Sequence, residues 1–110
     1  MERKEPINAT CPECRGPLTA QEHNGIVEFH CLVGHAYSPR ALLQAHSETQ
    51  ERTLWSAVVV LEEASNLVAA VSAQVSPQEL TRLSEQAEVK KLQAGQIRRL
   101  LKDLEPFQTD

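Results

Sequence analysis

Three cysteines and one histidine near the start of the chain constrain its fold more than any other feature. They are Cys11, Cys14, Cys31 and His35, with two residues between the first two cysteines, 16 before the third, and three between Cys31 and His35. Two metal ligands three positions apart on a tight turn can converge on one cation, and a second pair brought alongside completes a tetrahedron. The spacing therefore predicts a metal site built from three sulfurs and one imidazole nitrogen.

Zinc is the metal that this set of ligands favours. Zinc accepts three cysteines with one histidine, whereas iron–sulfur clusters usually take four cysteines, and this chain of 110 residues has only three. Because the protein fills all four tetrahedral positions, no position remains for a catalytic water. We therefore predict one structural zinc ion, Zn2+, with the ligands Cys11, Cys14, Cys31 and His35.

The identity of the fourth ligand is open to alternatives, because the chain has four histidines. His35 has the spacing of a paired ligand, and Gly34 before it allows a sharp turn. His30 directly precedes the third cysteine on an expected strand and should point to the opposite face. Two further alternatives are His23, which lies at an expected turn, and His46, which lies about two turns into an expected helix. We predict His35 as the ligand.

The odd number of cysteines excludes a disulfide framework that uses all of them. One disulfide with a free thiol remains as the alternative to a metal site. No uninterrupted apolar run is longer than that of residues 57–61, which is far shorter than the ~20 residues of a membrane span, and no apolar segment follows the charged N-terminus. We therefore expect a soluble cytoplasmic protein without membrane insertion, in a compartment where disulfides are rare.

Residues 1–38 are predicted to form a small zinc ribbon. Segments 18–22 and 26–31 read as short strands, and the Asn-Gly pair between them is a strong signal for a tight turn in a β-hairpin. The hairpin would bring the two halves of the metal site together. Tyr37 and the pair Leu42-Leu43 are expected to hold this ribbon against the start of the following helix.

Helices are predicted for residues 39–110. Ser-Pro pairs at 38–39 and 76–77 each supply an N-cap hydroxyl and a proline at the first helical position, and a glutamate three residues after the second serine completes a capping box. No glycine or proline interrupts residues 40–74, which predicts one helix of about 35 residues. A second helix should run to about residue 104. The predicted fold class is mostly α with a small β-hairpin.

Apolar residues recur at alternating spacings of three and four along both predicted helices, as in a coiled coil. In the first helix they are Leu54, Ala57, Leu61, Ala64, Val68, Val71 and Val75. In the second helix they are Leu80, Leu83, Ala87, Ala94, Ile97, Leu101 and Leu104. The short connection between the helices predicts an antiparallel helical hairpin.

The first helix carries more apolar surface than one partner helix can cover. Trp55, Val58, Val59 and Val60 widen its stripe. The four consecutive apolar positions 58–61, each turned by about 100° from the last, cover most of the helix circumference. We therefore expect a homodimer through the helices, in which two hairpins form a four-helix bundle. The alternative is that the ribbon folds back over this surface.

The sequence predicts no enzymatic activity, because it contains no serine-hydrolase elbow, HExxH sequence, Walker loop or glycine-rich dinucleotide turn. Many zinc ribbons bind nucleic acid, which makes that function the main rival. The formal net charge is −4, and the first 38 residues carry three basic against five acidic residues. A small basic cluster, which also suits the dipole at the end of the second helix, consists of Arg98, Arg99 and Lys102.

Parts of the chain resemble the zinc-ribbon and helix segment found as a C-terminal extension in some bacterial chemotaxis protein-glutamate methylesterases. The resemblance covers about residues 9–70. It is carried by Cys11-Pro12-Glu13-Cys14, Phe29-His30-Cys31-Leu32-Val33-Gly34-His35-Ala36-Tyr37-Ser38-Pro39, Leu42-Leu43, Leu54-Trp55-Ser56-Ala57 and Leu61-Glu62-Glu63. It implies a bacterial two-component or chemosensory setting and metal binding by Cys11, Cys14, Cys31 and His35. It does not imply methylesterase activity, because that family's catalytic and receiver domains have no counterpart in these residues.

The sequence therefore predicts a non-enzymatic zinc-binding adaptor or regulatory module in bacterial signalling. Its helical hairpin would make the contacts with a signalling protein partner. Two alternatives remain at this point: a zinc-ribbon DNA-binding transcriptional regulator, and a purely structural oligomerisation module.

Overall fold

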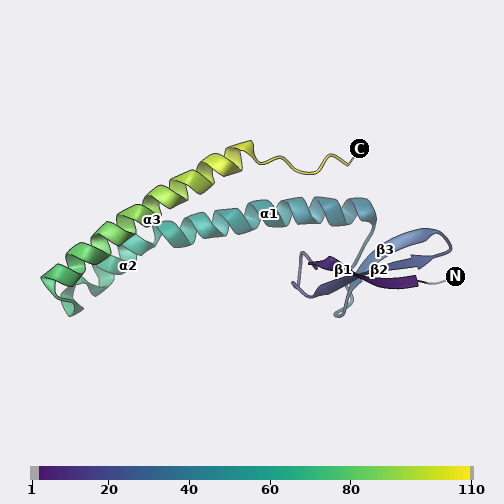
Figure 1. The fold of residues 1–110 in the computed structure, drawn as a ribbon, viewed down its shortest axis with the longest axis horizontal. Helices are drawn as coiled ribbons and strands as arrows, with labels where there is room; N and C mark the ends of the chain where they lie inside the picture. The colour runs from purple at the N-terminus through teal and green to yellow at the C-terminus, as the bar shows by residue number, and fades with distance from the viewer. Residues whose placement is uncertain (1–2, 110) are drawn as a thin grey trace. The chain divides into compact units, whose positions relative to one another are not determined.

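The computed structural model describes residues 3–109, which divide into two compact units (Figure 1). The first unit runs to Thr49 and includes the chain again from Glu105, and the second is Gln50–Leu104. Helix α1 (Pro39–Glu62) contributes residues to both. The chain is mostly helical, with one small sheet, as the composition and the turn signals predict.

An antiparallel sheet of four strands forms most of the first unit. Its strands β1 (Arg3–Thr10), β2 (Pro17–His23), β3 (Ile26–Cys31) and β4 (Ala36–Tyr37) are hydrogen-bonded in that order. The predicted hairpin is therefore the central pair of a larger sheet. The sequence did not reveal β1, because this strand is polar and almost wholly exposed and contains a proline, as edge strands often do. Strand β4 is too short for a detectable pattern.

The turn between β2 and β3 is the one that the Asn-Gly pair predicts. Asn24 and Gly25 have φ values of 53° and 82°, and His23 pairs with Ile26 across the turn. Two consecutive residues with positive φ define a two-residue hairpin turn whose twist matches that of the flanking strands. The turn fixes the register in which Leu18 faces Cys31.

The core of the first unit is small and contains two of the cysteines. Its buried side chains are Cys11, Leu18, Cys31 and Tyr37, and the half-buried side chains packed against them are Ile7, Phe29, Leu42 and Ala45. Tyr37 and Leu42 therefore hold the ribbon to the helix as expected, but Leu43 does not, because its side chain is 38% exposed. Residues three apart share a helix face, so Ala45 takes the place expected for Leu43.

The segment after the last helix belongs to the first unit, which the sequence did not predict. The backbone N–H of Phe107 donates to the Ser47 hydroxyl at 3.0 Å, and Ser47 is buried. The Phe107 ring lies 6.3 Å from the His46 ring between centroids. Arg40 also donates to the backbone carbonyl of Thr109. This tail covers polar positions of α1 that would otherwise face water.

The predicted helix of about 35 residues is divided into shorter elements. Helix α1 is followed by α2 (Ala64–Val71) and by a 3-10 turn, η1 (Ser72–Gln74). Glu63 separates α1 from α2, although its N–H still donates to the Val59 carbonyl at 3.0 Å and its carbonyl accepts from Leu67 N–H at 3.0 Å. The interruption is therefore slight, because hydrogen bonds between residues four apart continue through it.

Both helix starts are those predicted. The Ser38 hydroxyl accepts from Ala41 N–H at 3.2 Å at the start of α1. The Ser76 hydroxyl accepts from Glu79 N–H at 3.1 Å at the start of α3 (Pro77–Asp103). A side-chain acceptor satisfies one of the N–H groups that a first helical turn leaves without a backbone partner.

The second unit is a helical hairpin in which α2 packs against α3 (Figure 1). Its buried side chains are Val58, Ala87 and Ala94. The apolar stripe predicted for α3 is at least half-buried at every position. For α1 and α2, which replace the predicted first helix, the predicted stripe is wrong at Val71, which is 42% exposed. Val58 of α1, outside the predicted stripe, is fully buried.

An ion pair and an aromatic contact join α1 to α3 within this unit. Arg98 donates to both carboxylate oxygens of Glu62, at 2.9 and 3.1 Å. The guanidinium also lies over the Trp55 ring, 5.4 Å from its centroid. The hydrogen bonds with Arg98 lower the pKa of Glu62, so this carboxylate stays charged at neutral pH.

Within residues 3–109, one helical stretch, Pro39–Gln74, is long and apolar enough to cross a membrane if only length and composition are considered. The stretch contains no long uninterrupted apolar run, because its apolar residues are interspersed with polar ones. Glu62 and Glu63 lie within the stretch, and charged side chains at the centre of a bilayer are costly. The ionised Glu62–Arg98 pair therefore favours a helix surface in contact with water or protein.

Candidate metal centre

Two tight turns carry the candidate ligands. In the first turn, Arg15 N–H donates to the Cys11 carbonyl at 2.8 Å and Cys11 N–H donates to the Gly16 carbonyl at 2.7 Å. Arg15 has a φ of 64°, which closes the turn. A Cβ at Gly16 would lie 3.4 Å from the Cys14 sulfur, so a side chain there would contact the thiol.

The second turn connects β3 to β4. Cys31 N–H donates to the His35 carbonyl at 3.1 Å, and Gly34 N–H donates to the Cys31 carbonyl at 3.3 Å. Gly34 has a φ of 115°, a conformation that residues with a side chain rarely adopt, which explains the glycine. His35 N–H also donates to the Cys31 sulfur at 3.3 Å. The turn therefore places the cysteine sulfur and the imidazole on the same side.

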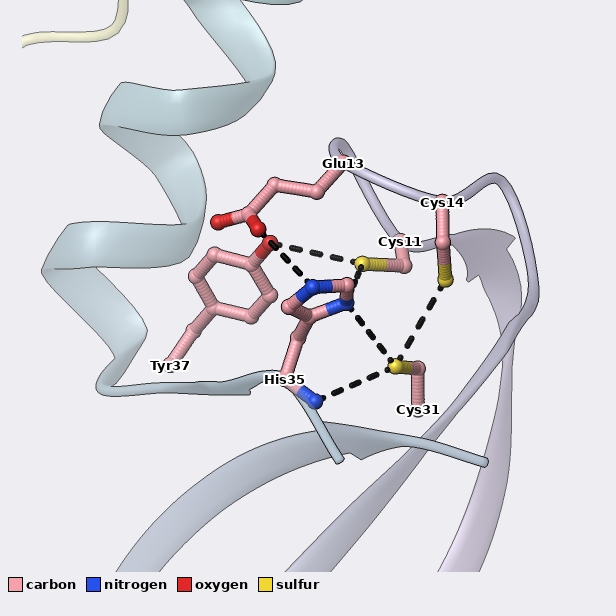
Figure 2. A network of polar contacts seen from close by, with 6 residues as sticks. All are labelled: Cys11, Glu13, Cys14, Cys31, His35 and Tyr37. Atoms are coloured by element: carbon pink, nitrogen blue, oxygen red, sulfur yellow. Dashed lines mark hydrogen bonds and ion pairs between the residues drawn. The ribbon is translucent and has the colours of Figure 1, made fainter. Parts of the chain in front are cut away.

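The four predicted ligands come together in one cluster, shown in Figure 2. The ligand atoms of Cys11, Cys14, Cys31 and His35 all lie within 4.8 Å of one another. His35 Nδ1 is 3.5 Å from the Cys11 sulfur and 3.3 Å from the Cys31 sulfur, and the Cys14 and Cys31 sulfurs are 3.6 Å apart. All three thiols, which lie in the described part of the chain, are free. The cluster can hold a metal ion.

The electrostatics of Cys31 favour a thiolate. Burial acts to raise its pKa, but donation from the His35 backbone and the contact with Cys14 outweigh burial and lower the pKa to about 6. The hydrogen bond with Cys31 raises the pKa of His35, and the negative charge of Glu13 adds to this effect. The surroundings of Cys31 therefore stabilise its thiolate before any cation enters.

The other two thiols differ from each other. Burial acts to raise the pKa of Cys11, but the Tyr37 hydroxyl and the backbone N–H groups of Cys14 and Glu13 outweigh it and lower that pKa. Donation from the Gly16 backbone lowers the pKa of Cys14, but desolvation and the neighbouring sulfurs raise it overall. Three thiolates close together repel one another, and a divalent cation is the species that removes this repulsion.

Two residues that the sequence did not assign to the metal site contact the cluster. Glu13 Oε2 lies 2.9 Å from His35 Nε2, on the side of the ring away from the sulfurs. The Tyr37 hydroxyl lies 3.3 Å from the Cys11 sulfur. Glu13 lies between the two cysteines of the first turn and Tyr37 lies two residues after His35, so their sequence positions could have indicated both.

The other three histidines lie outside the cluster. His30 Nε2 is 3.2 Å from a Glu28 carboxylate oxygen, on the strand face opposite Cys31 as expected. His46 lies near Phe107 with the two ring planes tilted by 40°, and His23 is an exposed residue at the end of β2. The structure therefore brings His35, and none of the alternatives, to the three sulfurs.

Acidification is expected to weaken metal binding steeply. The pKa of Cys31 in the folded chain, about 6, lies below the ordinary thiol value of 9.0, so the thiolate's contribution to folding is full above pH 9 and disappears as the pH falls through 6. Protons then compete with the metal for the sulfur and for His35, whose pKa is raised. Chelator competition at pH 8, 7, 6 and 5 should show an affinity that falls on the order of tenfold or more per unit below pH 6. A zinc affinity that does not change between pH 7 and pH 5 would contradict the assignment of these ligands.

Comparison of the chain with protein-family models, with curated proteins and with solved structures finds no match. The class of protein is therefore defined by its own fold and site. It is a mostly helical protein whose small antiparallel sheet carries a cluster of three cysteines and one histidine that can hold a metal ion.

Proposed function

We propose that the protein is a zinc-binding adaptor or regulatory module of bacterial signalling, in which the metal stabilises a zinc ribbon and the helices bind protein. The observation that carries the proposal is the spacing of the ligand atoms. Zinc bonds of about 2.3 Å to sulfur and 2.0–2.1 Å to nitrogen, arranged as a tetrahedron, place two sulfurs about 3.8 Å apart and a sulfur and a nitrogen about 3.6 Å apart. In the cluster, the Cys14 and Cys31 sulfurs are 3.6 Å apart, and His35 Nδ1 lies 3.5 and 3.3 Å from the sulfurs of Cys11 and Cys31. All the ligand atoms lie within 4.8 Å of one another.

A structural role for the zinc is supported by the place of its ligands in the core. Cys11 and Cys31 are two of the four buried residues that form the apolar core cluster of the first unit. The remaining apolar core, Leu18 and Tyr37 with their half-buried neighbours, is small for a unit of this size. Four protein ligands complete a tetrahedral site, which is the arrangement of structural rather than catalytic zinc.

Exposed apolar side chains support protein binding by the helices. On the second unit the large apolar residues that are exposed are Trp55, Val59, Val60, Leu67, Val71, Val89, Leu92 and Leu100. A hairpin of two helices has no further layer of its own to cover them, and this number of large exposed apolar side chains favours association. We propose that a second copy covers part of this surface in a four-helix bundle, and that a signalling protein is the further partner.

The adaptor proposal is tested by binding to defined partners. Immobilised full-length protein, loaded with zinc, should retain a purified bacterial chemosensory kinase, receptor or methylesterase component. A Leu92→Glu/Leu100→Glu variant, which places charge on exposed apolar positions of α3, should retain at least tenfold less. A Gln96→Glu variant on the same helix is the control. Retention of the protein's own second copy alone would favour the purely structural oligomerisation module.

Nucleic-acid binding is less well supported. Arg98, part of the only basic cluster that the sequence indicated, is engaged by Glu62 and by the Trp55 ring. Its neighbours Arg99 and Lys102 line a surface groove that also contains Glu51. A salt-sensitive shift of random duplex DNA in gels, weakened by Arg98→Ala/Arg99→Ala, would favour the regulator over the adaptor.

A further inference from the structure

We infer that Glu13 is a positioning residue that makes His35 bind the metal through Nδ1. This inference rests on the proposed metal site and adds a residue outside the four ligands. Glu13 is carried by the turn between Cys11 and Cys14, so its carboxylate reaches the cluster from the side of the first ligand pair, while His35 comes from the second.

The two ring nitrogens of His35 face different chemistry. Nδ1 is 3.3 and 3.5 Å from two sulfurs, and Nε2 is 2.9 Å from a carboxylate oxygen of Glu13. A neutral imidazole has one N–H, and a carboxylate can only accept. Glu13 therefore holds the proton at Nε2, and the lone pair of Nδ1 is left facing the sulfurs, where a metal ligand is needed.

A second side chain, Tyr37, contacts the cluster from outside the four ligands. Its hydroxyl, which is buried, lies 3.3 Å from the Cys11 sulfur. Figure 2 shows Glu13 and Tyr37 on the same side of the His35 ring. Glu13 therefore contacts the imidazole ligand, and Tyr37 contacts a sulfur ligand.

The exposure of Glu13 separates this role from a contribution to folding. Its side chain is 60% exposed, and exposed ion pairs contribute little to the stability of a fold. Partners of metal-bound histidines nevertheless change metal affinity by 10- to 100-fold, because they fix the tautomer and the basicity of the ring. Removing the carboxylate should therefore lower the affinity for metal and leave the fold intact when metal is saturating.

The sequence offers a matched control in the same sheet. Glu28 contacts His30 through Nε2 at 3.2 Å, much as Glu13 contacts His35, but neither residue belongs to the cluster. Glu28→Ala removes a carboxylate–histidine pair without touching the candidate ligands. Glu13→Gln, in contrast, keeps an acceptor for the Nε2 proton and removes only the charge.

The test measures zinc affinity by chelator competition on the full chain, together with the 15N shifts of the His35 ring in the zinc-loaded protein. We expect a protonated Nε2 and a metal-bound Nδ1 in the unsubstituted chain. We expect affinity 10- to 100-fold lower for Glu13→Ala at unchanged stoichiometry, a smaller loss for Glu13→Gln, and no change for Glu28→Ala.

Different results would overturn different proposals. Equal affinities for the unsubstituted chain and Glu13→Ala, or zinc bound through Nε2, would overturn the role of Glu13 while leaving the metal site in place. An equal loss in Glu28→Ala would show a general charge effect and would also overturn it. No uptake of zinc by the unsubstituted chain would overturn the proposed function and this inference together.

Discussion

Replacing His35 with alanine is expected to abolish zinc binding or weaken it by several orders of magnitude, whereas His46→Ala keeps about one zinc ion per chain. His35 lies in the cluster with the three sulfurs, and His46 lies against Phe107 instead. Without the imidazole, one tetrahedral position loses its protein ligand. Metal analysis after gel filtration measures the content of each variant. Equal loss from both variants would contradict the assignment of the fourth ligand.

The same loss of metal is expected to unfold the sheet but not the helical hairpin. Structural zinc contributes on the order of 10–16 kcal/mol in small metal-dependent domains. The first unit has few buried side chains apart from the cysteines, whereas the second contains no candidate ligand. Addition of a strong chelator should therefore remove the NMR dispersion of β2 and β3 while most helical circular dichroism remains. Intact sheet signals in the presence of the chelator would contradict a structural role for the metal.

Placing two charges on the exposed face of α1 and α2 is expected to convert a dimer into a monomer. Val60 of α1 and Leu67 of α2 are 65% and 64% exposed. They lie seven residues apart in a helical run that continues through Glu63, which puts them on the same face. If a second copy covers this face, Val60→Glu/Leu67→Glu buries two unpaired carboxylates. The association constant should then fall on the order of 100-fold or more, because unpaired charges are costly in an apolar interface.

Sedimentation of the zinc-loaded protein at tens of micromolar measures this association. Asn66→Glu is the control, because it adds charge at a neighbouring position that is already polar and exposed. A monomer for the unsubstituted protein at these concentrations would exclude the shared bundle. A dimer that survives both charges would place the interface on another surface.

Local chemistry explains which parts of the fold could be predicted from the sequence. The Asn24-Gly25 turn and the two serine caps depend on a few adjacent residues, and each has the expected geometry. The cluster of Cys11, Cys14, Cys31 and His35 was also predictable, since each pair is held by its own tight turn.

The missed features depend on contacts between residues far apart in the chain. Strand β1 has no apolar alternation, and it forms because β2 offers a free edge. The tail at Phe107 docks through one backbone N–H on Ser47, which no sequence pattern indicates. Leu43 and Val71 were predicted to be covered but are exposed. In each helix the apolar residues span more of the surface than the neighbouring elements can cover.

The dual use of Cys11 and Cys31, as core residues and as candidate ligands, connects the lifetime of the first unit to metal supply. A ligand that binds only the folded state adds about 1.4 kcal/mol of stability for each tenfold rise in its free concentration above the dissociation constant. Proteases that cleave transiently opened chains respond to the same free energy. Under the proposed function, zinc scarcity would therefore shorten the half-life of the sheet and release a helical hairpin without its ribbon. The abundance of intact protein in the cell would then follow the free zinc level.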